Sequence, residues 1–495
     1  MLIKLFKFIA IAVLMLVLIL GINTWRNSSK QLVVQPLPEL KVDANLVSEH
    51  LAGAVRPRTI FSFVNEDQGA AEFQKLHRHM EASFPNLHRV LKREVVNGQG
   101  LLYTWVGKDA KAKPILLLAH QDVVPIAPGT ETLWQQPPFD GVRKDGFVWG
   151  RGAWDNKSNL VSQMEAVEML IVSGFQPERT VYLALTHDEE VARRDAEAIA
   201  KLLNSRGIKL DLVLDEGLMV LQGVLSGIEK PVAMIGIAEK GYRSVHFKTT
   251  TAPGHSSMPP PMGTSAIARM SEAMDRLEHH PFPAKIGGVA REMLETVAPE
   301  MEGLNRIALS NLWLFEPLVK RQLEQTGGSG NAMLRTTTAL TIFHAGNKEN
   351  VLPAFAEATI NFRLLPGDTE ASVMAHINEV IEQDKIEVKM SSIESSDATP
   401  VMATDTPNYR LLNRTVREIF PDAIVAPGLM VAATDSAMFT SICENIYKFS
   451  PIRAKKEELS RFHGTNERIS ESNLAEMVRF YHRFLSVTAG PSAAK

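Results

Sequence analysis

The sequence predicts an α/β protein: a mostly parallel β-sheet flanked by helices, interrupted by an inserted α+β lid and preceded by an N-terminal apolar helix. Three observations support this fold class. Short apolar runs alternate with helical segments up to about residue 237, strictly alternating patterns follow, and residues 8–25 carry no charge. Uninterrupted apolar runs are typical of parallel strands buried on both faces, whereas alternation is typical of half-exposed strands.

A chain of 495 residues is too long for one compact core, so we expect several segments. The formal net charge of -3 gives no basic surface for nucleic acid, and the single cysteine, Cys443, excludes an intramolecular disulfide. The expected segments are a membrane anchor and spacer (1–44), the first part of the main domain (45–237), an inserted lid or dimerisation domain (238–398) and the second part of the main domain (399–490).

The N-terminal apolar run extends from Phe8 to Trp25 and follows Lys4 and Lys7. At about 1.5 Å per residue it nearly crosses a hydrocarbon core of about 30 Å. Because the lysines precede the run, the positive-inside rule places the rest of the chain on the non-cytoplasmic side, which is periplasmic, lumenal or extracellular. The alternative is a cleaved signal peptide and a secreted protein; the run lacks a small-x-small pair at its end, which favours the anchor.

Acidic and imidazole side chains follow three apolar runs of the predicted sheet. The run 115–118 leads to His120 and Asp122, the run 181–185 leads to Glu189 and Glu190, and 212–214 leads to Asp215. The carboxyl ends of parallel strands are where ligands bind in open α/β sheets. We therefore expect these side chains to meet at one edge.

The segment after Asp155 predicts a helix, because Leu160, Met164, Val167 and Ile171 recur at helical spacing before Gly174. In the insert, Val245 and Phe247 and later residues 360, 362 and 364 alternate as strands do, and residues 266–277 have helical periodicity. This combination predicts an α+β layer.

The mixture of residue types indicates a two-metal hydrolase. Imidazole and carboxylate both bind zinc, and two ions that share a carboxylate can polarise a carbonyl and activate water. Of the adjacent Glu189 and Glu190, one can be a ligand and the other a general base. Asp122 lies two residues after His120 and can orient its ring.

Seven segments, in this order, resemble the carboxypeptidase S and aminoacylase family of dinuclear zinc exopeptidases, including its N-fatty-acyl-amino acid hydrolase branch. The similarity extends from about residue 50 to about residue 485. The segments are HQDVVP (120–125), GRGAWDNK (150–157), DEEV (188–191), DEG (215–217), GHSS (254–257), NVLP (350–353) and HGTNE (463–467).

The resemblance implies two Zn²⁺ per chain, with Co²⁺ or Mn²⁺ as substitutes, and a zinc-exopeptidase-like fold. Asp155 would bridge the metals, His120 and Asp215 would complete one site, and Glu190 and His463 the other. Glu189 would be the general base and Asp122 the partner of His120. His255, on the lid, would stabilise the oxyanion, often across a dimer interface. Asn350 and Arg363 would hold the substrate's main chain and carboxylate; Arg363 could also be a solvated residue of an alternating strand.

Two segments depart from the family's pattern. A glycine-rich turn usually follows Glu-Glu-Val, whereas this chain has ARRDA at 192–196, which makes the loop bulkier and more charged. Ala437 stands where an arginine often contacts the substrate's carboxylate, so Arg363 becomes the stronger candidate for that contact.

The predicted function is zinc-dependent hydrolysis of amide bonds in small carboxylate-ended substrates, either short peptides attacked from the C-terminus or N-acyl amino acids. The expected partners are that substrate, a membrane through the N-terminal helix and, through the lid, a second copy of the chain; relatives that act as monomers leave the oligomeric state open. Two alternatives remain at this point: a membrane-tethered binding domain without catalysis, and a dinuclear phosphoesterase, which uses similar ligands.

Overall fold

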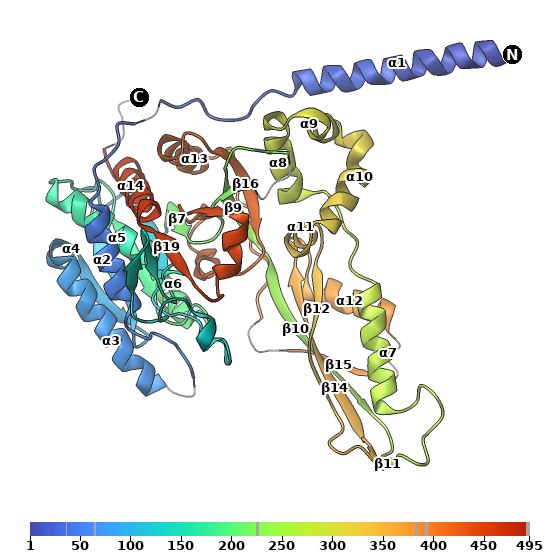
Figure 1. The fold of residues 1–495 in the computed structure, drawn as a ribbon. Coiled ribbons are helices and arrows are strands. Elements are labelled where there is room, and N and C mark those ends of the chain that lie inside the picture. Colours follow the sequence, from blue (N-terminus) through green and yellow to red (C-terminus); the bar gives the residue numbers. More distant parts are fainter. Residues whose placement is uncertain (36, 64–65, 224–226, 382–384, 392–394, 492–495) are drawn as a thin grey trace.

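The computed structural model describes the chain except for residues 36, 64–65, 224–226, 382–384, 392–394 and 492–495. Helix α1 (Leu2–Arg26) extends away from the body, and no residue of it is buried (Figure 1). Within the described chain it is the one helix whose length and composition suffice to cross a membrane, a test that a signal sequence also passes.

The main sheet contains strands from both expected parts of the main domain. Its order is β1-β2-β6-β3-β7-β17-β9-β8-β18, and β16 pairs with β9. The strands are β1 (Lys92–Val96), β2 (Gly100–Trp105), β3 (Ile115–His120), β6 (Val181–Thr186), β7 (Leu212–Asp215), β8 (Val220–Gln222), β9 (Val232–Glu239), β16 (Ile424–Met430), β17 (Ile446–Lys448) and β18 (Arg453–Lys455). The runs 115–118, 181–185 and 212–214 are therefore confirmed as strands, and each is fully buried.

The main sheet is mixed, which corrects the prediction of a mostly parallel sheet. The strands that carry the candidate residues, β6, β3 and β7, are parallel neighbours, whereas β1, β2 and β6 pair antiparallel, as do β8 and β9. A buried antiparallel strand is as apolar as a parallel one, so residue pattern alone could not separate them.

Helices pack on the main sheet around an extensive apolar core. They are α2 (Ala44–Val55), α3 (Glu66–Ser83), α4 (Pro85–Val90), α5 (Lys157–Val172), α6 (Arg194–Ser205), α13 (Pro407–Ile419) and α14 (Glu471–Thr488). Helix α5 is the one predicted after Asp155, and Gly174 follows its end with a positive φ of 79°. A small sheet of β4 (Val142–Lys144), β5 (Phe147–Trp149) and β19 (Arg468–Ser470) pairs a strand near the C-terminus with two strands from the first part of the main domain.

The insert contains a second, antiparallel sheet with the order β12-β14-β10-β15. Its strands are β10 (Gly241–Thr250), β12 (Thr337–Ala345), β14 (Phe355–Leu364) and β15 (Glu387–Met390), and α7 (Ala266–His279) and α12 (Glu370–Val380) cover one face. The short pair β11 (Gly254–His255) and β13 (Val351–Leu352) lies at the far tip (Figure 1). The expected α+β layer is thus present, while the boundaries at residues 44, 237 and 398 stay predictions.

Four further helices of the insert share a core with the edge of the main sheet. They are α8 (Gly288–Val297), α9 (Gly303–Ser310), α10 (Leu312–Gln325) and α11 (Gly328–Leu334). Helix α8 packs on β16, and the other three contact α8 or one another. Met293 and Leu294 of α8 share a core with Ile424 and Ala426 of β16. Part of the insert is therefore fastened to the main domain.

Candidate metal centre

The predicted acidic and imidazole residues meet at the carboxyl ends of the parallel strands. His120 is the last residue of β3, Glu189 and Glu190 follow β6, and Asp155 directly precedes the segment that enters α5. His463 comes from the loop before β19, where its φ of 57° is left-handed. Thus the sheet brings together residues that are more than 300 positions apart.

Asp155 lies between the two histidines. Its Oδ1 is 3.1 Å from His120 Nε2, and its Oδ2 is 2.8 Å from His463 Nε2. Glu190 Oε1 is 3.2 Å from the same His463 nitrogen. A carboxylate that reaches one imidazole with each oxygen has the arrangement required of a bridging ligand.

On the His120 side, the carboxyl group that faces the imidazole belongs to Glu216. Glu216 Oε1 is 3.2 Å from His120 Nε2, and Glu189 offers an oxygen within 4.8 Å of both groups. Asp215, the expected ligand, points elsewhere: its oxygens accept the backbone N–H groups of Glu216 and Ser436, each at 2.8 Å. Asp215 as a metal ligand therefore stays a prediction, and Glu216 is a second candidate because its carboxyl group lies nearer to His120.

Asp122 holds the cluster from behind. Its carboxylate is 3.3 Å from His120 Nδ1 and accepts the backbone N–H groups of Glu189 at 3.3 Å and Glu190 at 3.0 Å. Both His120 and Asp122 are buried. One side chain therefore orients the His120 ring and fixes the two glutamates.

A buried ion pair between Arg151 and Glu467 supports Asp155. Arg151 Nη1 donates to Glu467 Oε2 at 2.6 Å, while Glu467 Oε1 accepts the backbone N–H groups of Trp154 at 2.8 Å and Asp155 at 3.1 Å. Arg151 also donates to the backbone oxygen of His463. The GRG segment at 150–152 was the available signal for Arg151.

A second buried network lies behind Asp215 and was not predicted. Glu239 accepts hydrogen bonds from Thr434 and Ser436, and Lys448 Nζ is 3.3 Å from Glu239 Oε1. Lys448 ends an ordinary apolar strand run, so nothing in the local sequence marks it.

The protonation of the cluster reflects burial and close charges. Burial opposes a charge on His120, but Glu216, Asp122 and Asp155 together raise its pKa well above the usual value. Hydrogen bonds to Asp155 and Glu190 raise the pKa of His463 to about 10, and burial raises the pKa of Glu216 to about 7. Burial also raises the pKa of Glu189 well above its usual value. The cluster holds more carboxyl groups than imidazoles and favours added positive charge.

Two of the three predicted lid residues, His255 and Asn350, lie at the lid tip, apart from this cluster. His255 is exposed in β11 at the lid tip, where its Nδ1 is 2.8 Å from Ser257 Oγ, and the backbone oxygen of Asn350 accepts from Ser256 at 3.1 Å (Figure 1). Arg363 is only partly exposed, with its guanidinium 4.6 Å from the centre of the Tyr242 ring. Within one chain, His255 and the metal cluster are not brought together.

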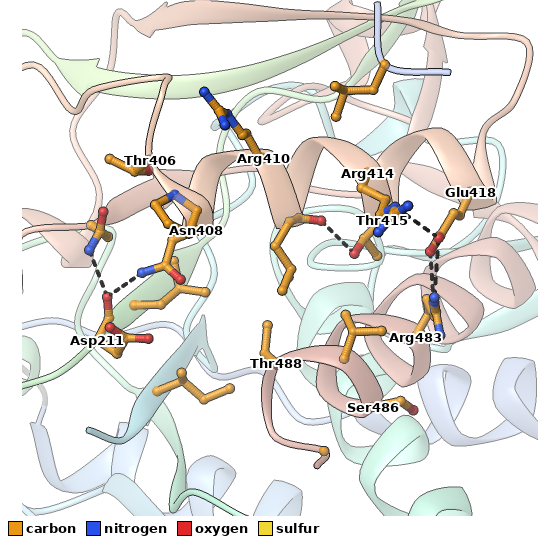
Figure 2. A pocket seen from close by; sticks show the side chains of 18 of the residues that line it. Asp211, Thr406, Asn408, Arg410, Arg414, Thr415, Glu418, Arg483, Ser486 and Thr488 are labelled. Atoms are coloured by element: carbon orange, nitrogen blue, oxygen red, sulfur yellow. Dashed lines mark hydrogen bonds and ion pairs between the residues drawn. The ribbon is translucent and has the colours of Figure 1, made fainter. Parts of the chain in front are cut away.

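A cavity of about 1240 Å³ lies at the opposite ends of β3 and β7, where Ile115 and Leu212 line it. Several of its polar groups are paired with one another: Asn408 donates to the Asp211 backbone oxygen, and Arg483 binds Glu418 (Figure 2). Because the imidazoles and most carboxylates of the chain's candidate motifs lie at the other strand ends, we place the candidate site there.

Comparisons with known proteins show the family. The model of peptidase family M20/M25/M40 matches residues 116–487. The chain belongs to this family. Carboxypeptidase S-like 2 of Dictyostelium discoideum is 39% identical over 96% of this chain and 92% of that protein. The N-fatty-acyl-amino acid synthase/hydrolase PM20D1 of Xenopus tropicalis is 40% identical over 88% of this chain and 84% of its own.

Solved structures of the family share the fold. A metallo-carboxypeptidase of Sulfolobus solfataricus has a TM-score of 0.61 at 18% identity and covers 90% of this chain and 99% of its own. Human carnosine dipeptidase 1 has a TM-score of 0.60 at 16% identity, over 89% and 95%. The predicted resemblance is thus confirmed, and the protein is a metal-dependent M20 hydrolase of amide bonds in small substrates. This activity displaces the two alternatives, a binding domain and a phosphoesterase.

Proposed function

We propose that the M20 protein holds two zinc ions and hydrolyses N-acyl amino acids or short peptides that end in a free carboxylate. Asp155 would bridge the metals, with His120 and Glu216 on one side and His463 and Glu190 on the other. Glu216 replaces Asp215 in this assignment because Glu216 is the residue whose carboxyl group lies 3.2 Å from His120.

The donor set fits this cofactor. Two imidazoles and several carboxylates are the ligand types of catalytic zinc, and hard or borderline ions such as Co²⁺ or Mn²⁺ suit the same atoms. His120 and Asp155 are buried, so their charges are screened little by water. Positive charge placed between them would relieve the repulsion among Glu189, Glu190 and Glu216.

Bound metal ions would supply Lewis acidity, which polarises the amide carbonyl and lowers the pKa of attacking water. Glu189 would take the proton of that water and pass it to the leaving nitrogen, because its backbone is held by Asp122 and it lies beside the metal donors. Asp122 and Glu467 would keep His120 and Asp155 in position.

The lid would recognise the rest of the substrate. Arg363 is the candidate for the free carboxylate and Asn350 for the main chain. His255 would reach a site only in a second copy of the chain, where it would stabilise the oxyanion. A homodimer through the lid is supported by β12, an edge strand with exposed Leu340, Ile342 and Phe343.

The position of the enzyme follows from α1. We propose that α1 is an uncleaved single-pass anchor and that Lys4 and Lys7 keep its start in the cytoplasm. The catalytic part would then be outside the cytoplasm. Secretion after removal of α1 is the alternative.

A substrate panel tests the proposal. Purified full-length protein is assayed on dipeptides, N-acetyl amino acids and N-fatty-acyl amino acids, before and after dialysis against a chelator. We expect hydrolysis of at least one class, its loss with the chelator, and its return with Zn²⁺. Activity that survives complete metal removal would contradict the proposal.

A single substitution tests the general base. In Glu189→Gln the side chain keeps its size but cannot accept a proton, so kcat should fall by about 10²–10⁴-fold. Bound zinc, measured by inductively coupled plasma mass spectrometry, should stay at the wild-type level. Glu444→Gln, on an exposed glutamate, is the matched control and should leave kcat unchanged. Turnover retained in Glu189→Gln would remove Glu189 from this role.

A further inference from the structure

The corner between α9 and α10 is joined to α1 through Asn311, a fully buried residue. Its Nδ2 donates to the Leu20 backbone oxygen at 3.3 Å and to Thr24 Oγ1 at 3.2 Å, while its Oδ1 accepts from Asn23 Nδ2 at 3.0 Å. A buried amide whose hydrogen bonds all go to protein fixes the segments that it joins. The last turns of α1 and the α9–α10 corner therefore form one unit.

Hydrogen bonds on both sides of Asn311 extend this unit. Asn27 Nδ2 donates to Ser310 Oγ at 2.9 Å, and Arg306 Nη2 donates to the Asn27 backbone oxygen at 3.4 Å. Ser29 Oγ donates to Glu300. Figure 1 shows the end of α1 beside α9, with α10 next to it. The contact thus continues from inside the apolar helix to the spacer after it.

The depth of the corner follows from α1. Trp25 and Arg26 are residue types that lie at the level of the lipid headgroups at the end of a membrane helix. Leu20 is six residues before Arg26, which places it about 9 Å deeper in the membrane along the helix axis. Because Asn311 is hydrogen-bonded to Leu20 and Thr24, a membrane crossed by α1 also meets the α9–α10 corner.

The surface of this corner is apolar. Leu304 is 83% exposed, Trp313 is 61% exposed and Leu318 is 60% exposed. Isolated exposed leucines need no explanation, but large apolar side chains grouped on adjacent helices indicate an interaction surface. Exposed tryptophan and leucine on short helices are typical of segments that lie in the membrane interface.

We propose that the α9–α10 corner, with Leu304, Trp313 and Leu318, is a second membrane contact that lies at the boundary between the headgroups and the acyl chains of the bilayer crossed by α1. This inference rests on the proposed anchor and is independent of the hydrolytic activity. Since α8 packs on β16 of the main sheet, the contact holds the catalytic domain against the membrane instead of leaving it on a free spacer.

Site-directed fluorescence tests this contact. Leu304→Cys and Leu318→Cys are each labelled with the dye NBD in the full-length chain and reconstituted in phosphatidylcholine vesicles that contain a doxyl-labelled lipid quencher. Labelling is confined to the new cysteine because Cys443 is buried, and burial raises the pKa of its thiol to about 11. Val106→Cys is the matched control, since Val106 is 71% exposed on the main domain.

We expect the lipid quencher to reduce emission several-fold more at positions 304 and 318 than at 106. Quenching equal to that of the control would overturn the proposal. A blue-shifted emission without lipid quenching would also overturn it and would indicate that protein, such as a second copy, covers the corner.

Two further measurements separate this inference from the proposals on which it rests. The intact mass of the purified chain shows whether residues 1–26 are retained. If they are removed, the proposed anchor is wrong. The same labels are then measured after vesicles are added to the shortened chain, and absence of lipid quenching there would overturn the proposed membrane contact. Hydrolysis of the best substrate in detergent should be unchanged in both labelled variants. A failure of the proposed hydrolytic function, seen in the substrate panel, can therefore be told apart from a failure of the proposed membrane contact, seen as absent lipid quenching.

Discussion

Asp215 and Glu216 are neighbours whose different surroundings decide which of them faces His120. Asp215 is the last residue of β7, and its two carboxylate oxygens accept hydrogen bonds from backbone N–H groups, one of them that of Ser436. Glu216 has one more methylene group and lies beyond the strand end, where its carboxyl group reaches His120 and accepts from Asn156. The longer side chain is therefore the one that faces His120.

A pair of substitutions separates the two acids. Glu216→Gln should lower bound zinc and reduce kcat/KM by at least about 10²-fold, since second metals in such sites stabilise charge in the transition state. Asp215→Asn should retain most of the metal and lower stability by about 1.5–3 kcal/mol, the value of hydrogen bonds to a charged group. Metal analysis and urea denaturation measure both effects. The reverse pattern, with metal lost in Asp215→Asn alone, would restore Asp215 as the ligand.

Glu467 is a buried charged residue that holds the backbone of Asp155 in position. It is completely buried, paired with Arg151 and bonded to the backbone of Trp154 and Asp155. Breaking a buried ion pair leaves one charge uncompensated, at a cost of about 3–5 kcal/mol.

Glu467→Gln should therefore lower the free energy of unfolding by about 3 kcal/mol and also reduce activity, because the Asp155 backbone loses a charged acceptor. Urea denaturation and steady-state kinetics measure these effects. The double variant Arg151→Met/Glu467→Leu should recover part of the stability but little activity. A Glu467→Gln protein within about 0.5 kcal/mol of wild type would contradict the structural role.

At the scale of elements, the loop after β6 explains how the chain tolerates ARRDA where glycines are usual. Arg193 adopts the left-handed conformation with a φ of 54°, and Asp188 caps α6 by accepting the N–H groups of Arg194 and Asp195. His187 is bound by Asp195 in turn. The loop is thus held by its own acids, and Glu189 and Glu190 keep their positions at the strand end.

The strand β14 presents Arg363 at the base of the lid. Among the residues that the structure describes, its guanidinium has no carboxylate partner, and it packs on Tyr242 at 4.6 Å. Burial lowers its pKa, although an arginine stays charged at neutral pH. A partly buried guanidinium without an acid is well suited to a substrate carboxylate.

Arg363→Ala should raise KM for carboxylate-ended substrates by about 10–100-fold, the equivalent of one charge-assisted hydrogen bond. KM for the same substrate with an amidated C-terminus should change little. Arg243→Ala is the matched control on neighbouring β10, where the arginine already binds Asp397. Equal effects on both substrates would mean that Arg363 acts through lid structure.

In the whole molecule, His255 on the lid lies apart from the metal cluster of the same chain, so its proposed oxyanion role would require a second copy. His255 belongs to β11 at the lid tip (Figure 1), whereas His120 ends β3 of the main sheet and His463 lies in the loop before β19. A homodimer would give each cluster the partner's lid.

Mixing two inactive variants tests this arrangement. His255→Ala and Glu189→Gln should each be nearly inactive, but their mixture after subunit exchange should recover about a quarter of wild-type activity, since about half of the dimers contain one complete site. Sedimentation measures the dimer in parallel. An active His255→Ala protein, or no recovery in a mixture shown to contain mixed dimers, would contradict the shared site.

The family, the strands around 115–120, 181–186 and 212–215, and most residues of the cluster could be predicted from the sequence, because apolar runs and local motifs depend on neighbours along the chain. Four features required the folded structure: Glu216 faces His120, Arg151 pairs with Glu467, the main sheet is mixed, and α9 and α10 join the end of α1. Each of these depends on side-chain direction or on contact between distant segments. Residue pattern specifies neither side-chain direction nor contact between distant segments. Strands pair, charges become buried and Asn311 binds Leu20 only when the whole core packs.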